Sequence, residues 1–466
     1  MKQNPRLIDV LYRAETGPIM DEADFERGLL GPEIKKLAQK YDIRYTGEEI
    51  INCNDDLADR VFQAALDLAG EVGVFNQSTS RRILWSREEI ENDLKSVPSV
   101  ASLGNGEQQF LITSRKPDDR KSMSVLGGVV GIPFPEDMYL PLVLSFLKQG
   151  IFDSIDGPSL ETAYGQPIKA GTGFEVLGAW REAELVQEAL EAADQPGRAV
   201  SAVELAPTAL GGLAGVTWGG YRPFDRHHVP MTSELKTNND LLAIITHINN
   251  LGGVIGAYYN PIYGGHAGGG EGVAILAAAG LILSYQLTLG HTFCTRPTHP
   301  FLGCDTTREI LWATSLATQA LSRNSNLMTA ALAGPAGGPG TKTIIYENAA
   351  FALMALSSGV SELLASHSAG GAVPRHGSGL DGRICVEIAR TMQGITREEA
   401  NHLLEKIVPL YESDLESKPI GKPFEEVYDL ESVEPTAEWQ GIYDQVRSEL
   451  FELGLPLDHF DSAGSK

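Results

Sequence analysis

The chain has 466 residues, of which 42% are hydrophobic and 21% charged, the composition of a folded protein with a large core. Its formal charge of −24 would repel a phosphate backbone, which argues against nucleic acid as a partner. The four cysteines are far apart and show no CxxC spacing, so we expect reduced thiols and a cytoplasmic protein rather than a disulfide framework.

The first 120 residues are predicted to be helical. Apolar residues recur at helical spacing in segments 21–43 and 55–74. A short helix should begin after Ser86, because Glu89 stands three residues later and completes a capping box. We expect residues 1–120 to form a helical extension packed on the rest of the chain.

From Ser124 onward, short apolar runs alternate with longer helical segments. The runs are 124–132, 150–155, 198–205, 252–259, 291–296, 326–332 and 362–367. Continuous apolar strands between helices are typical of a parallel sheet that is covered on both faces. The number of units favours a closed barrel, and no GxGxxG follows a first strand. The predicted fold class is α/β, a (β/α)8 TIM-type barrel over residues 121–395 with extra N-terminal and C-terminal helices.

The longest apolar stretch, residues 272–290, is close to the length of a membrane span. It lies among Gly-rich segments that alternate with other elements, so we expect a buried helix of the barrel and no association with a membrane. The N-terminus has no apolar run typical of a signal peptide. Residues 396–466 are predicted to add C-terminal helices and a loose tail.

Four glycine clusters each follow a predicted strand, at 211–220, 263–272, 333–340 and 368–373. In a barrel they would lie on the C-terminal face, where barrel enzymes have their active sites. Any one cluster is explained by a tight turn. Four clusters on one face favour a large ligand or a protein partner, because glycine lets the backbone approach it closely.

Several polar residues stand near the same strand ends. Ser201 and Glu204 end one strand, but the surrounding AVSAV is not the GxSxG of a hydrolase. Asp225 opens a cluster of titratable groups in which the adjacent His227 and His228 should point to opposite sides. Both a structural role and a pocket role are open for His228. No ligand spacing demands a zinc site, although His228, His266, His291 and Cys294 are candidate ligands.

Aromatic residues are also concentrated there. They are Trp218, Tyr221, Phe224, Tyr258, Tyr259 and Tyr263. An aromatic face stabilises a cation by about 0.5–2 kcal/mol. Ordinary packing is the alternative, but for a methylated ammonium we expect Tyr258, Tyr259 and Trp218, with Asp225, to bind the substrate.

Several segments are more specific than these patterns. They are KKLAQKYDIRYTGEEI, ADQPGRAV, PIYGGHAGGGEG, TTREIL and the long tail that begins LYESDLESKPIG. In this order, and over nearly the whole chain, they resemble the monomethylamine:corrinoid methyltransferases. The resemblance implies a (β/α)8 barrel that assembles as a homohexamer. It also implies transfer of a methyl group from methylamine to the Co(I) centre of a partner corrinoid protein.

The chain departs from that family at the expected site. The family has pyrrolysine after the segment that matches QPGRAV, and Ser201 stands at this position. A serine hydroxyl cannot form the amine adduct of the pyrrolysine imine. Glu204 matches a family glutamate, whereas two pocket carboxylates of the family fall on His228 and Tyr258. These replacements favour cation–π and hydrogen-bonding contacts over charge pairing, which suggests a more highly methylated or bulkier N-methyl donor.

The leading hypothesis is therefore a corrinoid-dependent methyltransferase that passes a methyl group from a methylated amine to a cobalamin-binding partner. His228 and Glu204 would act on the donor, and Ser201 would remain as a hydrogen-bonding residue.

The corrinoid would enter over the Gly-rich loop of Gly264, Gly265 and His266, with no cofactor held tightly by this chain. One alternative is a metal-assisted lyase or hydrolase that uses His228 and His266. The other is a non-catalytic paralogue that binds a corrinoid protein.

Overall fold

The computed structural model describes residues 4–202, 208–217 and 219–460. Its central sheet has eight strands, and all neighbouring strands run parallel. In order across the sheet they are β11 (Ser201–Ala202), β12 (Arg226–Met231), β14 (Val254–Tyr259), β15 (Thr292–Thr295), β16 (Met328–Leu332), β17 (Glu362–Ala365), β5 (Ser124–Gly127) and β7 (Ser154–Ile155). An isolated parallel bridge joins Ile155 to Val200, so the two edges of the sheet are in contact.

The predicted α/β class with a parallel sheet is confirmed, and each of the seven apolar runs contains a strand. The eighth strand, β12, was not recognised because its sequence, RHHVPM, is rich in polar side chains. Arg226 and His228 are nevertheless buried inside the sheet. Their partners come from distant parts of the chain, and a local hydrophobic pattern does not show them.

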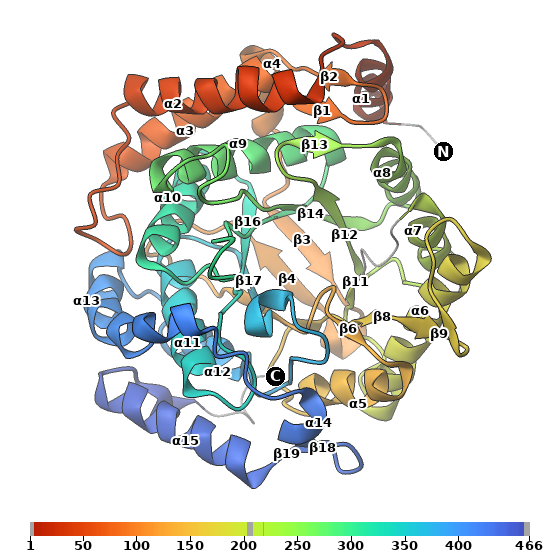
Figure 1. The fold of residues 1–466 in the computed structure, drawn as a ribbon, viewed down its shortest axis with the longest axis vertical. Coiled ribbons are helices and arrows are strands. Elements are labelled where there is room, and N and C mark those ends of the chain that lie inside the picture. Colours follow the sequence, from red (N-terminus) through yellow and green to blue (C-terminus); the bar gives the residue numbers. More distant parts are fainter. Residues whose placement is uncertain (1–3, 203–207, 218, 461–466) are drawn as a thin grey trace.

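Helices surround the sheet (Figure 1). They are α5 (Glu136–Leu147), α6 (Gly173–Ala192), α7 (Ala209–Gly215), α8 (Asn239–Leu251), α9 (Gly270–Thr288), α10 (Arg308–Asn324), α11 (Lys342–Ser357) and α12 (Arg383–Thr391). Within the described ranges, α9 is the one helix long and apolar enough to cross a membrane, and 94% of its apolar window is buried inside the protein. It is a core helix, as the sequence predicted.

The N-terminal helices pack against this layer. They are α1 (Pro5–Thr16), the π-helix η1 (Asp24–Leu30), α2 (Gly31–Lys40), α3 (Asp55–Val72) and α4 (Arg87–Leu94). Helix α3 lies against α9 and α10. The predicted capping box is confirmed, since Glu89 N–H donates to Ser86 Oγ at 3.2 Å and Ser86 N–H donates to Glu89 Oε2 at 2.6 Å.

The N-terminal region is also tied to the centre of the molecule by a small sheet. Strand β1 (Val74–Asn76) pairs with β2 (Arg81–Ile83) and, in parallel, with β13 (Lys236–Thr237). At the other end of the chain, α13 (Arg397–Ile407) and α15 (Ala437–Glu452) pack on α11, as the predicted C-terminal helices.

The remaining elements are short. They are β6 (Pro133–Phe134), β8 (Ser159–Leu160), β9 (Thr162–Ala163), β10 (Gln166–Pro167), β18 (Tyr428–Asp429), β19 (Glu434–Pro435), α14 (Phe424–Val427), η2 (Gly106–Gln108), η3 (Ser368–Gly371), η4 (Val408–Leu410), η5 (Glu412–Ser417) and η6 (Leu457–His459). The division at residues 120 and 395 stays a prediction.

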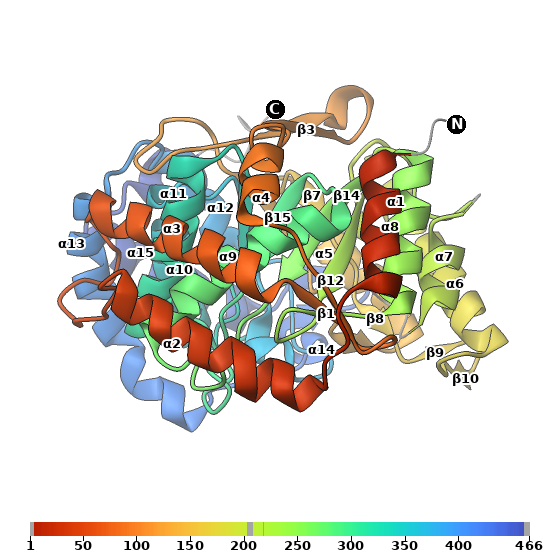
Figure 2. The same ribbon diagram turned by 90° about the horizontal axis from the view of Figure 1, so that it is seen from above.

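One end of the central sheet is covered. The hairpin of β3 (Val100–Leu103) and β4 (Phe110–Thr113) lies at that end, as Figure 2 shows for β3. Its buried side chains pack against Ala199 and Met328, which stand at the beginnings of strands. The opposite end, where the strands finish, faces the viewer in Figure 1. The interior of the sheet is therefore approached from the carboxyl ends of the strands.

Candidate functional site

The floor of the sheet's interior is a buried polar cluster. We use "floor" for Ser201, Arg226, Thr292 and Glu362, each the first residue of its strand. Arg226 forms an ion pair with Glu362, and the two side chains are 1% and 0% exposed. Arg226 also donates to Ser201 Oγ at 2.8 Å and to Thr292 Oγ1 at 3.4 Å. The Ser201 hydroxyl is thus held by the floor arginine.

Above the floor, His228 and Tyr258 lie side by side. Their ring centroids are 5.8 Å apart and the rings are tilted by 55°. His228 pairs with Gly256 in the ladder, two residues before Tyr258, so all three belong to the same face of the sheet. Gly256 makes room for the imidazole, because a Cβ there would lie 2.7 Å from His228 Cδ2.

A carboxylate stands beside this pair. Asp156 follows β7 directly, and its Oδ2 lies 4.0 Å from His228 Nδ1. Asp156 is 3% exposed and Tyr258 is 9% exposed. The Asp156 carboxylate and the rings of His228 and Tyr258, which are all mostly buried, are suited to bind a small cation.

The wall around Tyr258 is apolar. It is a cluster of Leu126, Tyr258, Cys294, Ala330, Leu332 and Leu364, separate from the cores under the helices. Apart from the Tyr258 hydroxyl and the Cys294 thiol, these side chains are apolar. They therefore lower the local dielectric and strengthen the charge interactions above them.

Arg296 lies beyond the end of β15, two residues after Cys294 and thus on the same face. Its Nε donates to Asp305 Oδ2 at 3.1 Å, and its Nη2 donates to the Gly370 carbonyl at 2.9 Å. Its Nη1 lies 3.4 Å from Nδ1 of His367, which follows β17. Burial lowers the pKa of His367 well below its usual value, and the Arg296 charge lowers it further.

Among the described residues, the ion-pair partner of the Asp305 carboxylate is Arg296. The carboxylate also accepts from Gly334 N–H at 2.8 Å. Burial raises the pKa of Asp305 to about 6, although Arg296 opposes that rise. We call Asp156, His228, Tyr258, Arg296, Asp305 and His367 the mouth residues.

Of the residues predicted from the sequence, His228 and Tyr258 lie together in the structure, and Ser201 lies on the floor. Tyr259 points to the other face of β14, because successive residues of a strand alternate. Its hydroxyl donates to Glu234 Oε2 at 2.9 Å and its ring packs on Gly280 of α9. Tyr259 therefore does not line the mouth, contrary to the prediction.

Asp225 is also away from the mouth. Its Oδ1 accepts from Val200 N–H at 2.9 Å, and both its oxygens accept from Arg222. The carboxylate is 1% exposed and supports the turn before β12. Glu204 and Trp218, the remaining predicted residues on these strands and loops, lie outside the described residues.

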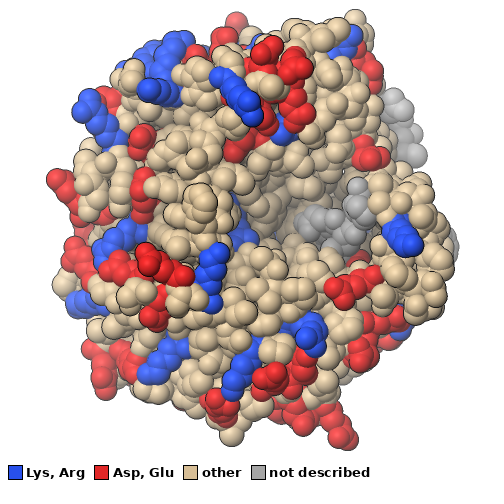
Figure 3. Space-filling model, in the orientation of Figure 1, with Lys and Arg blue, Asp and Glu red and all other residues tan. Residues whose placement is uncertain are grey.

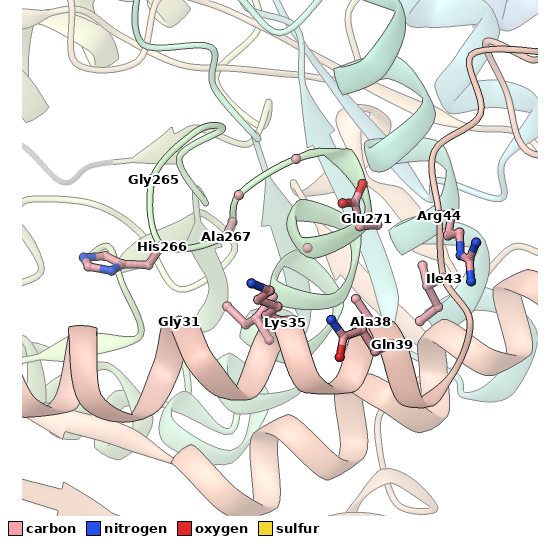
Figure 4. A pocket seen from close by; sticks show the side chains of 14 residues that line it. Gly31, Lys35, Ala38, Gln39, Ile43, Arg44, Gly265, His266, Ala267 and Glu271 are labelled. Atoms are coloured by element: carbon pink, nitrogen blue, oxygen red, sulfur yellow. The ribbon is translucent and has the colours of Figure 1, made fainter.

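Gly264, Gly265 and His266 belong to the loop between β14 and α9. Gly265 and His266 line a cavity of about 740 Å³ between this loop and helix α2, where Lys35 and Gln39 face the loop (Figure 4). His266 Nε2 lies 3.7 Å from Glu26. A role of these three residues towards a corrinoid stays a prediction.

The candidate zinc ligands are not gathered in the described part of the chain. There, no three His, Cys, Asp or Glu side chains are placed to hold a metal ion. His291 Nδ1 instead accepts from Ile255 N–H at 3.2 Å. The metal-assisted alternative thus has no ligand set among the described residues.

Asp156, Arg296 and His367 were not predicted from the sequence. A signal was available for all three. Asp156 directly follows the run 150–155, and Arg296 and His367 are the last residues of their own runs. Charged residues at the carboxyl ends of barrel strands are candidates for a site by position alone.

Comparison with known proteins agrees with this architecture. A family model described as "Monomethylamine methyltransferase MtmB" matches residues 6–455. MtmB2 of Methanosarcina acetivorans is 31% identical over 447 residues, which cover 96% of this chain and 97% of that protein. MtmB of Methanosarcina mazei is 29% identical over the same length. The crystal structure of Methanosarcina barkeri MtmB superposes with a TM-score of 0.93 at 29% identity, covering 96% of this chain and 98% of that one. The resemblance seen in the sequence is confirmed, and the chain belongs to the monomethylamine methyltransferase MtmB family.

Proposed function

We propose that this protein transfers a methyl group from a methylated amine to the reduced cobalt of a corrinoid carried by a partner protein. The observation that carries the proposal is the grouping of His228, Tyr258 and Asp156 above a buried floor, in a chain that belongs to a methyltransferase family. The partner brings the corrinoid, so this chain has to bind the donor and leave the mouth accessible.

The proposal includes a closed (β/α)8 barrel. Eight parallel strands and the bridge between Ile155 and Val200 support closure. Figure 3 shows a hollow in the middle of the face at the carboxyl ends of the strands, surrounded mainly by uncharged residues. Enzymes of this fold have their sites at this end.

In the reaction, the methyl carbon–nitrogen bond breaks and its electron pair stays on the amine nitrogen. The methyl group forms a bond to cobalt with the electron pair that Co(I) supplies. A quaternary or protonated ammonium is a good leaving group, because the departing amine is neutral. Such a displacement needs a fixed line through nitrogen, carbon and cobalt, and a site from which water is excluded.

The residues of this chain have separate tasks. Tyr258 and His228 hold the ammonium group, and Asp156 balances its charge. The leucines of the apolar wall exclude water. Ser201 is fixed below by Arg226 at 2.8 Å and contributes a buried hydrogen bond. Glu204 and Trp218 are assigned to the site from the sequence. The homohexamer and the cytoplasmic location stay predictions from the resemblance.

The test is methyl transfer to free Co(I) cobalamin from mono-, di- and trimethylamine, tetramethylammonium and N-methylated amino acids, followed by absorbance. We expect methylation with at least one donor, and a lower rate for Tyr258→Leu. No methylation from any N-methyl compound would contradict the proposal and favour the non-catalytic paralogue.

A further inference from the structure

The mouth has two electrically different sides. Asp156, His228 and Tyr258 lie on the side of β7, β12 and β14, where a cation is favoured. Arg296 and His367 lie on the side of β15, β16 and β17. The apolar wall of Leu126, Leu332 and Leu364 belongs to the same interior. A ligand with a cationic end and an anionic end would match both sides at once.

Arg296 is held rigidly and has donors to spare. Its guanidinium lies flat against Gly334, where a Cβ would come within 2.0 Å of Nη2 and 2.3 Å of Cζ. An arginine has five N–H bonds. Among the described residues, Asp305, Gly370 and His367 accept three of them. Two N–H bonds remain on a side chain that is 9% exposed.

His367 adds a donor beside it. Arginine cannot accept a hydrogen bond, so His367 Nδ1 must be the acceptor in its contact with Arg296. The neutral ring then carries its proton on Nε2. This Nε2 is buried and has no hydrogen-bond partner among the described residues, in a side chain whose residue is only 8% exposed. Such a group is costly to leave unsatisfied, which indicates a ligand oxygen as its acceptor.

We propose that Arg296 and His367 bind the carboxylate of a zwitterionic methyl donor, an N-methylated amino acid whose ammonium group lies against Tyr258 and Asp156. This inference rests on the proposed function and names the substrate class for the same site. The product is the same amino acid with one methyl group fewer.

A carboxylate suits the site better than a phosphate. Asp305 already pairs with Arg296 at 3.1 Å, so little positive charge is left over. A monoanion with two coplanar oxygens can accept from the guanidinium and from the imidazole together. A dianion beside Asp305 would be poorly compensated.

The experiment uses donor pairs that differ only in the carboxylate. N-methylglycine is compared with methylamine, and N,N,N-trimethylglycine with tetramethylammonium, in methyl transfer to free Co(I) cobalamin. The measured quantity is the ratio of kcat/KM within each pair. We expect the native protein to prefer the carboxylate-bearing member of at least one pair by roughly tenfold or more, and R296Q to lower that ratio roughly tenfold to a hundredfold.

Further variants separate binding from folding. R296K keeps the charge and should restore part of the ratio, because lysine lacks the fixed fork of donors. H367F keeps an aromatic ring without its nitrogens and should lower the ratio less than R296Q. The matched control is R375Q. Arg375 is 48% exposed and pairs with Glu425, so its replacement should leave the ratio unchanged.

The outcomes are distinct. Equal losses for both members of a pair in R296Q would show a purely structural arginine and overturn the inference. Native protein that methylates cobalamin from carboxylate-free amines with no preference for zwitterions would overturn it too, while the proposed function would stand. If R296Q does not fold, the ratio in H367F decides, and an unchanged ratio there overturns the inference. No transfer from any donor contradicts the proposed function itself.

Discussion

The floor and the mouth of the sheet's interior are both buried and both contain an arginine paired with a carboxylate. On the floor, Arg226 pairs with Glu362 and also donates to two hydroxyls. In the mouth, Arg296 pairs with Asp305, and Nε2 of its neighbour His367 has no hydrogen-bond partner among the described residues. The floor is closed by the hairpin of β3 and β4, whereas the mouth is reached from outside.

This difference shows how one kind of buried ion pair can serve two purposes. The floor pair is shielded from water, and its role is structural: if one partner is removed, the other is left as an unpaired buried charge, which is costly. A pair at the carboxyl ends of the strands, beside an imidazole N–H that has no acceptor among the described residues, would suit the ligand proposed for the mouth. Position along the strands separates the two cases, because the floor residues begin their strands, whereas the mouth residues lie further along the strands or follow them.

The largest expected effect is on the floor. Arg226→Met removes the partner of a carboxylate that is 0% exposed, and should lower the free energy of unfolding by about 3–5 kcal/mol. Urea denaturation measures it. The double variant Arg226→Met with Glu362→Leu should recover most of the loss, because no unpaired charge remains.

The control is Arg44→Gln, whose partner Asp42 is 70% exposed and whose loss should cost less than about 0.5 kcal/mol. A loss of similar size in Arg226→Met and Arg44→Gln would mean that the floor is not the closed structural unit described above.

The next comparison uses two adjacent tyrosines on opposite faces of β14. Tyr259→Leu should lower the free energy of unfolding by about 2 kcal/mol, because a fully buried ring and its hydrogen bond to Glu234 are lost. Methyl transfer per folded molecule should be unchanged.

Tyr258→Leu should affect activity more than stability. It should lower kcat/KM by about 2- to 30-fold, which corresponds to the loss of one cation–π contact, with a smaller change in stability. Equal effects on activity from both variants would contradict the assignment of Tyr258 alone to the mouth.

The mouth ion pair should also give a pH-dependent stability. Burial raises the pKa of Asp305 to about 6, above the value of about 4 in an unfolded chain. The folded protein therefore binds this proton more tightly. The resulting stabilisation is fully present below pH 4 and is lost as the pH rises through 6, about 3 kcal/mol in all.

Asp305→Asn keeps an acceptor for Arg296 and Gly334 but cannot titrate. Denaturation at pH values from 4 to 7.5 should show that the native protein loses stability relative to the variant as the pH rises. Asp42→Asn is the exposed control. Parallel curves for the native protein and Asp305→Asn would contradict the raised pKa.

Most of the central fold could be predicted from the sequence, since parallel strands are buried on both faces and appear as continuous apolar runs. Strand β12 could not be predicted, because the neighbours of its polar side chains are far away in the chain: Arg226 pairs with Glu362, and His228 lies 4.0 Å from Asp156. The alternation of side chains in a strand already separates Tyr258 from Tyr259, and the predicted aromatic cage overlooked it.

The site was only partly predictable for a related reason. His228 and Tyr258 were found in the sequence as part of a titratable cluster and as an aromatic strand end, and the resemblance to the family placed two pocket carboxylates at the same positions. Arg296 and His367 stand at the ends of predicted runs, but their significance depends on Gly334 and Gly370, whose approach is a matter of tertiary structure. No spacing in the sequence indicates that the Nε2 of His367 will lack an acceptor among the residues that the structure describes.

The smallest expected effect concerns Ser201, the position that the sequence resemblance matches to the pyrrolysine of the family. In the structure its hydroxyl accepts from Arg226 at 2.8 Å and belongs to the floor. Ser201→Ala should lower the free energy of unfolding by about 1 kcal/mol, the net value of one such bond, and change kcat/KM less than about threefold. Ser201→Thr, which keeps the hydroxyl, is the matched variant for the hydrogen bond. If Ser201→Ala instead lowered kcat a hundredfold at unchanged stability, the hydroxyl would take part in the reaction. Ser201 would then belong to the mouth rather than to the floor.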